Sequence, residues 1–168
     1  MELFKKQKNL FLLMQNKKPL QELRLEVLTD LNALSQVLVW FETDAAPLLS
    51  EKIYWECKLV IAEGFTNAVR HAHQGLPSKT PIKLEVIFFT QYLEMKIWDK
   101  GRPFDLISKL KHQIKLHKNF DPKKDDIPES GRGLIWMKEL TDELNYIRTP
   151  DQRNCLFMVK KLRKIRGV

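Results

Sequence analysis

The stretch Glu63-Gly-Phe-Thr-Asn-Ala-Val-Arg-His-Ala72 lies inside a helical pattern that we expect to run from Ser50 to about His73. At about 100° per residue, one side of this helix is an apolar stripe and the other side is polar. Glu63 and Asn67 are one turn apart and point into the same space. The apolar stripe consists of Ala62, Phe65, Val69 and Ala72.

The polar pair in this helix has the chemistry of a phosphate site. An amide oxygen such as that of Asn67 is a suitable ligand for Mg²⁺, and a carboxylate one turn away can orient or deprotonate a hydroxyl that attacks a phosphate. Gly64 costs a helix about 1 kcal/mol relative to alanine, which indicates that something approaches closely there. On this segment alone, an ordinary solvated helix face remains the alternative.

A second segment, Asp99-Lys-Gly-Arg-Pro-Phe-Asp105, follows an apolar strand pattern. An acid at a strand end can accept a hydrogen bond from an exocyclic amine such as that of adenine. Gly101 would let the backbone approach the ring closely. A plain turn at these residues is the alternative.

A third segment, Ser130-Gly-Arg-Gly133, precedes a helical pattern. The free backbone N–H groups of Gly131 and Gly133 and the helix dipole would face an anion, and Arg132 adds a charge suited to phosphate oxygens. A lone Gly-x-Gly can also simply cap a helix. The spacing matches neither a Walker loop nor a dinucleotide fingerprint.

The remaining periodicity predicts an α+β fold, a two-layer sandwich of a mixed, mostly antiparallel sheet with helices on one face. We expect residues 1–18 to be a basic extension and residues 19–168 to be one domain, with a functional lid at about 106–130. The other expected elements are strands at 20–28, 82–90, 92–98, 142–148 and 155–162, a helix capped by Thr29 or Asp30 that ends before Pro47, and a helix that begins near Gly133.

Composition sets the broad class of the protein. The net charge of +8, much of it at the two ends, allows an acidic partner, but solvated tails are the favoured explanation. Cys57 and Cys155 are far apart and lack metal-ligand spacing, so we expect a reducing cytoplasmic setting. No apolar run approaches the roughly 20 residues of a membrane span. His71 and His73 are splayed apart at i, i+2, which favours structural or rim roles over metal binding.

Taken in order, the three segments resemble the motifs of the GHKL ATPase superfamily, and within it the small anti-sigma factors that are also serine-protein kinases. Residues 63–72 are similar to the N box, residues 99–105 to the G1 box, and residues 131–137 to the G2 box. The stretch 139–144 also fits. The resemblance covers roughly residues 20–162 and implies the Bergerat ATP-binding fold.

The resemblance also implies roles for individual residues. Glu63 matches the catalytic base, Asn67 the magnesium ligand and Asp99 the acid that reads adenine, with Gly101 beside the base. Gly131 and Gly133 match the lid-end glycines that contact phosphates, and for Arg132 we expect a phosphate contact. The implied cofactors are ATP and Mg²⁺. The implied assembly is a homodimer that phosphorylates a serine or threonine of an anti-anti-sigma (STAS-type) partner and controls a sigma factor.

Three other functions were weighed. A GHKL-like module could sequester a partner without phosphoryl transfer, although Glu63 would then have no purpose. The basic tails could bind nucleic acid, but no recognised motif or stacking platform supports this, so direct binding is not expected. A histidine kinase core would need a dimerisation domain and a phospho-acceptor histidine for which the chain has no room.

Overall fold

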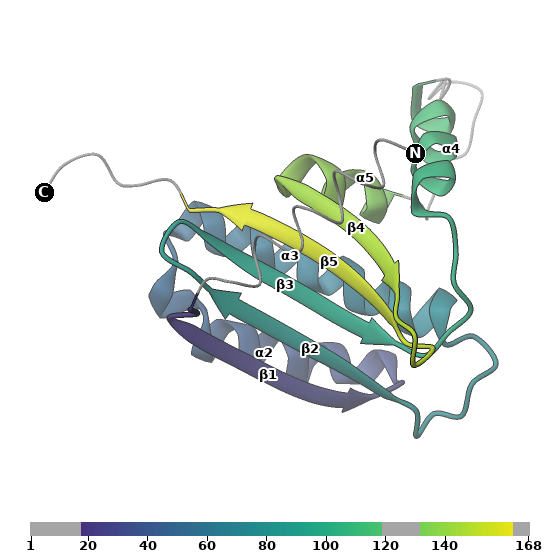
Figure 1. Cartoon of the computed structure of the whole chain (residues 1–168), viewed down its shortest axis with the longest axis horizontal. Coiled ribbons are helices and arrows are strands. Elements are labelled where there is room, and N and C mark those ends of the chain that lie inside the picture. The colour runs from purple at the N-terminus through teal and green to yellow at the C-terminus, as the bar shows by residue number, and fades with distance from the viewer. Residues whose placement is uncertain (1–17, 119–131, 163–168) are drawn as a thin grey trace, which may run out of the picture.

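The computed structural model describes residues 18–118 and 132–162, and in them a five-stranded sheet is covered on one face by α2, α3 and α5, while α4 lies beside α5 beyond the sheet edge (Figure 1). The strand order is β1-β2-β3-β5-β4, and every pair is antiparallel. The α+β sandwich is confirmed, but the parallel component of a mixed sheet is not found in this part of the chain. The strands are β1 (Gln21–Leu28), β2 (Pro81–Phe88), β3 (Tyr92–Asp99), β4 (Glu143–Arg148) and β5 (Asn154–Lys161).

The helices agree in place with the predicted ones, with one addition. They are α2 (Leu34–Asp44), α3 (Glu51–Asn67), α4 (Leu106–Lys118) and α5 (Arg132–Leu140), with 3-10 turns η1 (Leu31–Ala33) and η2 (Ala46–Leu48) and a π-helical segment η3 (Ala68–Ala72). None of the helices in residues 18–118 and 132–162 combines the length and apolar character that a membrane span requires.

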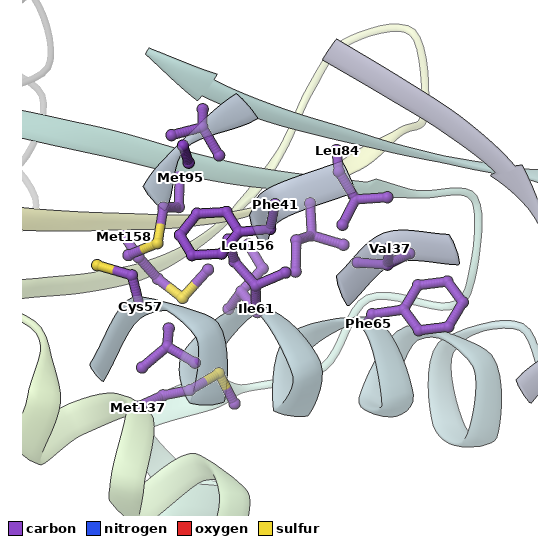
Figure 2. Packing of buried hydrophobic residues seen from close by; sticks show 14 of the residues in the cluster. Val37, Phe41, Cys57, Ile61, Phe65, Leu84, Met95, Met137, Leu156 and Met158 are labelled. Carbon is purple, nitrogen blue, oxygen red and sulfur yellow. The ribbon is translucent and has the colours of Figure 1, made fainter. Parts of the chain in front are cut away.

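The core lies between the sheet and α2, α3 and α5 (Figure 2). Alternate strand residues point toward the helices, as the two-residue period of a strand requires. Each apolar side chain that is fully buried contributes about 1.5–3 kcal/mol to folding. Side chains that are at most 2 % exposed include Val37, Phe41, Ile61, Phe65, Leu84, Met95, Ile97, Met137 and Met158.

The buried face of α3 is rotated from the predicted stripe. Phe65 is buried as expected, but Ala62, Val69 and Ala72 are only half-buried. Before Asn67 the difference arises because α3 packs against α5 as well as the sheet. After Asn67 the helix widens into the π-helical η3, which changes the phase of the side chains that follow. The buried positions at the end of α3 and in η3 are Ile61, Gly64, Phe65 and Ala68.

The close approach predicted at Gly64 is confirmed. A Cβ atom there would lie 2.5 Å from Ile97 Cδ1 and 3.2 Å from Leu156 Cδ2. The absent side chain therefore lets α3 pack directly onto β3 and β5. This contact brings the polar side of the helix close to the ends of those strands.

The segment expected to be a lid begins as a regular helix, α4. Asp105 caps it, because its Oδ1 accepts from Ser108 N (3.0 Å) and its Oδ2 from Ser108 Oγ (2.8 Å). The sequence signal was the Asp-x-x-Ser spacing at the start of a weak apolar period. The rest of the predicted lid and most of the predicted N-terminal extension lie outside the described residues. Ser50 begins α3 as predicted but makes no capping hydrogen bond with its side chain.

A second close approach gives a test of the fold. A Cβ atom at Gly101 would overlap the carbonyl group of Ala72, which is backbone and cannot rotate away. We expect Gly101→Ala to lower the free energy of unfolding by about 2–4 kcal/mol in urea denaturation.

Gly75→Ala is the matched control for this substitution. Gly75 has φ 80° with open space around its Cα, so alanine there should cost only about 1–2 kcal/mol through backbone strain. An equal or smaller cost at Gly101 would contradict the close packing of η3 against the 99–101 turn.

Candidate functional site

Three polar residues form one row across the sheet at the end of β3. The strand register pairs Asp99 with Asn154 and Asn154 with Arg148. Paired residues of neighbouring strands point to the same face, so the three side chains meet on the helix-covered side. Asp99 is 3 % exposed and Asn154 is fully buried.

The carboxylate of Asp99 is held by three protein donors. Its Oδ1 accepts from Gly101 N (2.8 Å) and Asn154 Nδ2 (2.7 Å), and its Oδ2 accepts from the Tyr146 hydroxyl (3.0 Å). A buried carboxylate requires such donors to remain charged. Asp99 is therefore a buried acid whose position is fixed by its donors.

Asn154 and Arg148 fix the turn that follows Asp99. The second N–H of Asn154 donates to the Gly101 carbonyl (3.0 Å), and the Arg148 guanidinium donates both to that carbonyl (3.0 Å) and to Asn154 Oδ1 (2.9 Å). The orientation of the Asn154 amide follows, because its nitrogen faces two acceptors and its oxygen faces a donor. Gly101 is thereby held in place from both sides.

A pocket lies between α3 and this row, and it has an empty volume of about 410 Å³, open solvent included. Asn67 and Asp99 both line it, so the structure brings together two residues that are far apart in the sequence. Lys109 lies at its edge, with Nζ 5.1 Å from the centre of the Phe104 ring. The other lining residues are Gly64, Ala68, His71, Ala72, Ile97, Leu134, Tyr146 and Leu156.

Glu63 lies against the start of α5. A Cβ atom at Gly133 would overlap Glu63 Oε2, so the glycine leaves room for the carboxylate beside the backbone. Burial raises the pKa of Glu63 above its usual value, and the charge of Arg70 partly offsets the rise. A carboxylate with a raised pKa is a better proton acceptor than an ordinary surface acid.

The other predicted ligand residues have mixed outcomes. Asn67 is half-buried at the end of α3, one turn from Glu63 as expected. Arg132 is exposed at the first position of α5, and Gly133 is buried directly after it. Gly131 lies outside the described residues, so its predicted phosphate contact stays a prediction.

The two histidines have different environments. His73 is 2 % exposed: its Nε2 accepts from Lys100 N (2.8 Å), and its Nδ1 lies 2.6 Å from Thr29 Oγ1, which donates to the Thr80 carbonyl. Because Nε2 is an acceptor, the ring is neutral with its proton on Nδ1. His71 is exposed and lines the pocket. The predicted structural and rim roles are therefore observed.

A protein-family model, the histidine kinase-like ATPase domain, matches residues 27–160. The chain belongs to this family. The match covers most of the chain and includes Glu63, Asn67, Asp99 and Gly133. The GHKL relationship inferred from the three motifs is thus confirmed.

Two individual proteins are similar to this member of the ATPase family. The serine-protein kinase RsbW of Bacillus licheniformis is 29% identical over 90 residues, which are 54% of this chain and 55% of that protein. The chain thus spans about half the length of this curated relative. The crystal structure of the RsbU and RsbW domains of Rv1364c from Mycobacterium tuberculosis has a TM-score of 0.52 at 15% identity, and covers 90% of this chain and 36% of that chain. That likeness confirms the fold.

Several residues of this ATPase-family site were not predicted. Tyr146 and Arg148 lie in β4 and Asn154 is the first residue of β5, one residue before the strand predicted at 155–162. The available signal was the strand period: Tyr146 and Arg148 share the parity of Leu144, and Asn154 that of Leu156. These residues lie beside Asp99 because of the register between the strands, and sequence periodicity does not determine that register.

The neutral His73 predicts how stability depends on pH. Burial lowers the pKa of His73 below 6.5, with Asp99 acting in the opposite direction. The unfolded chain therefore binds this proton at a higher pH than the folded one, and stability falls as pH decreases below about 6.5. We expect this histidine to contribute at most about 1.4 kcal/mol of loss per pH unit in that window.

Urea unfolding at pH 7.5, 6.5 and 5.5 measures this contribution. His73→Gln keeps a donor and an acceptor but does not titrate, so its pH dependence should be shallower than that of the wild type. His112→Gln, at an exposed position on α4, is the control and should leave the dependence unchanged. Identical slopes in all three proteins would contradict a buried neutral His73.

Proposed function

We propose that the protein is an ATP-dependent serine/threonine-protein kinase that phosphorylates an anti-anti-sigma partner and thereby controls the availability of a sigma factor. The observation that carries the proposal is the convergence of Asn67 and the buried Asp99 on one pocket. Membership of an ATPase domain family and the likeness to a protein named as a serine-protein kinase support it.

The residues around the pocket fit a nucleotide with its metal ion. Asp99 would accept the hydrogen bond of the adenine amine, and Gly101 would lie beside the ring. Asn67 would supply an oxygen to Mg²⁺, which neutralises phosphate charge when it is bound. Arg132 and the backbone of Gly131 and Gly133 would contact the phosphates at the start of α5.

Glu63 is the proposed catalytic base. It lies one turn before Asn67 and against Gly133, so it is close to the residues assigned to metal and phosphates. Its raised pKa suits the removal of a proton from a serine or threonine hydroxyl as the phosphorus–oxygen bond forms. The proton then resides on the Glu63 carboxyl until it is released to solvent.

The partners follow from the family resemblance. We propose a STAS-type anti-anti-sigma protein as phosphoryl acceptor, a sigma factor as the second partner, a homodimer as the working form, and the cytoplasm as its location. The relative named as a serine-protein kinase supports a protein as the phosphoryl acceptor, and it matches about half of either chain. The alternative is a module of the same fold that sequesters a protein without transferring phosphate.

The nucleotide site is tested by calorimetric titration of ATP with Mg²⁺. We expect Asp99→Asn to weaken binding by about 10- to 100-fold, because an acceptor bound to the adenine amine is replaced by an amide. Asp44→Asn, at an exposed position on α2, is the control and should bind as the wild type does. Absence of ATP binding by the wild type would rule out the kinase function.

Phosphoryl transfer separates the kinase from the sequestering module. We expect Glu63→Gln to reduce transfer to a STAS-type protein by 10²- to 10⁴-fold while ATP binding persists. The wild-type rate should fall on acidification at a pH above the ordinary Glu value of 4.5, because the pKa of Glu63 is raised.

Glu51→Gln, on the first turn of the same helix, is the control and should retain the wild-type rate. The sequestering module would be favoured if the wild type binds the partner but transfers no phosphate to it, and if Glu63→Gln behaves in the same way in both assays.

A further inference from the structure

Tyr146 is held at two points beside the predicted adenine-reading acid. Its ring lies against Phe104, with centroids 4.2 Å apart and planes tilted by 34°. Its hydroxyl donates to Asp99 Oδ2 at 3.0 Å. Both Tyr146 and Asp99 line the pocket, so this hydrogen bond is formed at the surface that a ligand would contact.

The hydrogen bonds of Asp99 leave little of its carboxylate available. A carboxylate has about four acceptor positions, two on each oxygen. Gly101 N and Asn154 Nδ2 use both positions of Oδ1, and Tyr146 uses one position of Oδ2. One position therefore remains, on the oxygen that the Tyr146 hydroxyl orients.

We propose that Tyr146 is the residue that sets base selectivity at this site, by orienting Asp99 so that a single acceptor position faces the pocket. The proposal rests on the proposed function. One acceptor position matches one N–H donor, such as an exocyclic amine at position 6 of a purine. A purine with an oxo group there presents an acceptor to an acceptor and is excluded.

The role of the hydroxyl is clearest from its removal. In Tyr146→Phe the ring keeps its packing on Phe104, but Oδ2 has two open positions and loses its anchor. A water molecule can then donate to Asp99 and also donate to an oxo group of the base. The variant should therefore bind a purine nucleotide with an amino group at position 6 less tightly, and one with an oxo group there more tightly, than the wild type does.

The test compares ATP with inosine triphosphate, which differs at position 6 of the base, by calorimetry in the presence of Mg²⁺. We expect Tyr146→Phe to weaken ATP binding about tenfold, as the loss of an oriented hydrogen bond to a charged group does, while the inosine nucleotide binds as well as or better than before. The selectivity ratio should thus fall by tenfold or more.

Tyr54→Phe is the matched control, because it also removes one phenolic hydroxyl, which interacts with Lys58 on the α2 side of α3 rather than with Asp99. It should leave the ratio unchanged. A thermal melt checks that both variants are folded; the open position in Tyr146→Phe faces the pocket, so the fold should survive.

Three outcomes would overturn the role of Tyr146. In the first, the ratio of the two affinities stays at the wild-type value. In the second, both nucleotides bind more weakly by the same factor, which would indicate a structural effect only. In the third, ATP binds more tightly, which would indicate that the hydroxyl competes with the base. Any of these outcomes would refute only the role of Tyr146 if Asp99→Asn still binds ATP more weakly than the wild type does. The proposed nucleotide site would then stand. Failure of the wild type to bind ATP would overturn the proposed function and this role together.

Discussion

The buried carboxylate of Asp99 is the constraint on which this end of the molecule depends. A charge at 3 % exposure is stable only if donors surround it. Gly101, Tyr146 and Asn154 supply them, and Arg148 in turn fixes Asn154. The carboxylate thus ties together β3, β4, β5 and the turn after β3, and the same donors determine what is left of it for a ligand.

Helix α3 contributes to both the core and the pocket: Gly64 packs on the sheet and also lines the pocket, and Asn67 lines the pocket beside it. A glycine at position 64 favours the packing of α3 onto the sheet, because the side-chain ends of Ile97 on β3 and Leu156 on β5 lie close to the place of a Cβ atom. That close contact brings Asn67 to the pocket that Asp99 lines. A second glycine, Gly133, lets Glu63 lie against α5. The absent side chain of Gly64 thus allows close contact between α3 and the sheet, and that of Gly133 leaves room for the Glu63 carboxylate between α3 and α5.

The order of elements could be predicted, and so could Asn67 and Asp99 as residues that come together, because helical and strand periods and the three glycine-containing segments are local signals. Glu63, Asn67 and Asp99 were identified from such signals. Tyr146, Arg148 and Asn154 were not, since their roles depend on which residues pair across β3, β5 and β4. The rotation of the buried face of α3 was missed for a similar reason, because it depends on packing against α5, and the π-helical turn at 68–72 changes the phase of the helix further on. The helix at 106–118 has only a weak apolar periodicity, and its N-terminal cap, Asp105, was not recognised from the sequence.

The row formed by Asp99, Asn154 and Arg148 also restricts where residues can be inserted or deleted during evolution. Strand side chains alternate between faces, so adding or deleting one residue in β5 would turn Asn154 away from Asp99 while leaving the strand itself able to pair. Asp99 would then lose the amide donor of Asn154, and the side chains on one side of the change would exchange faces of the sheet. Length variation among descendants of this chain should accordingly concentrate in the connections, whereas β3, β4 and β5 should accept substitutions but neither insertions nor deletions.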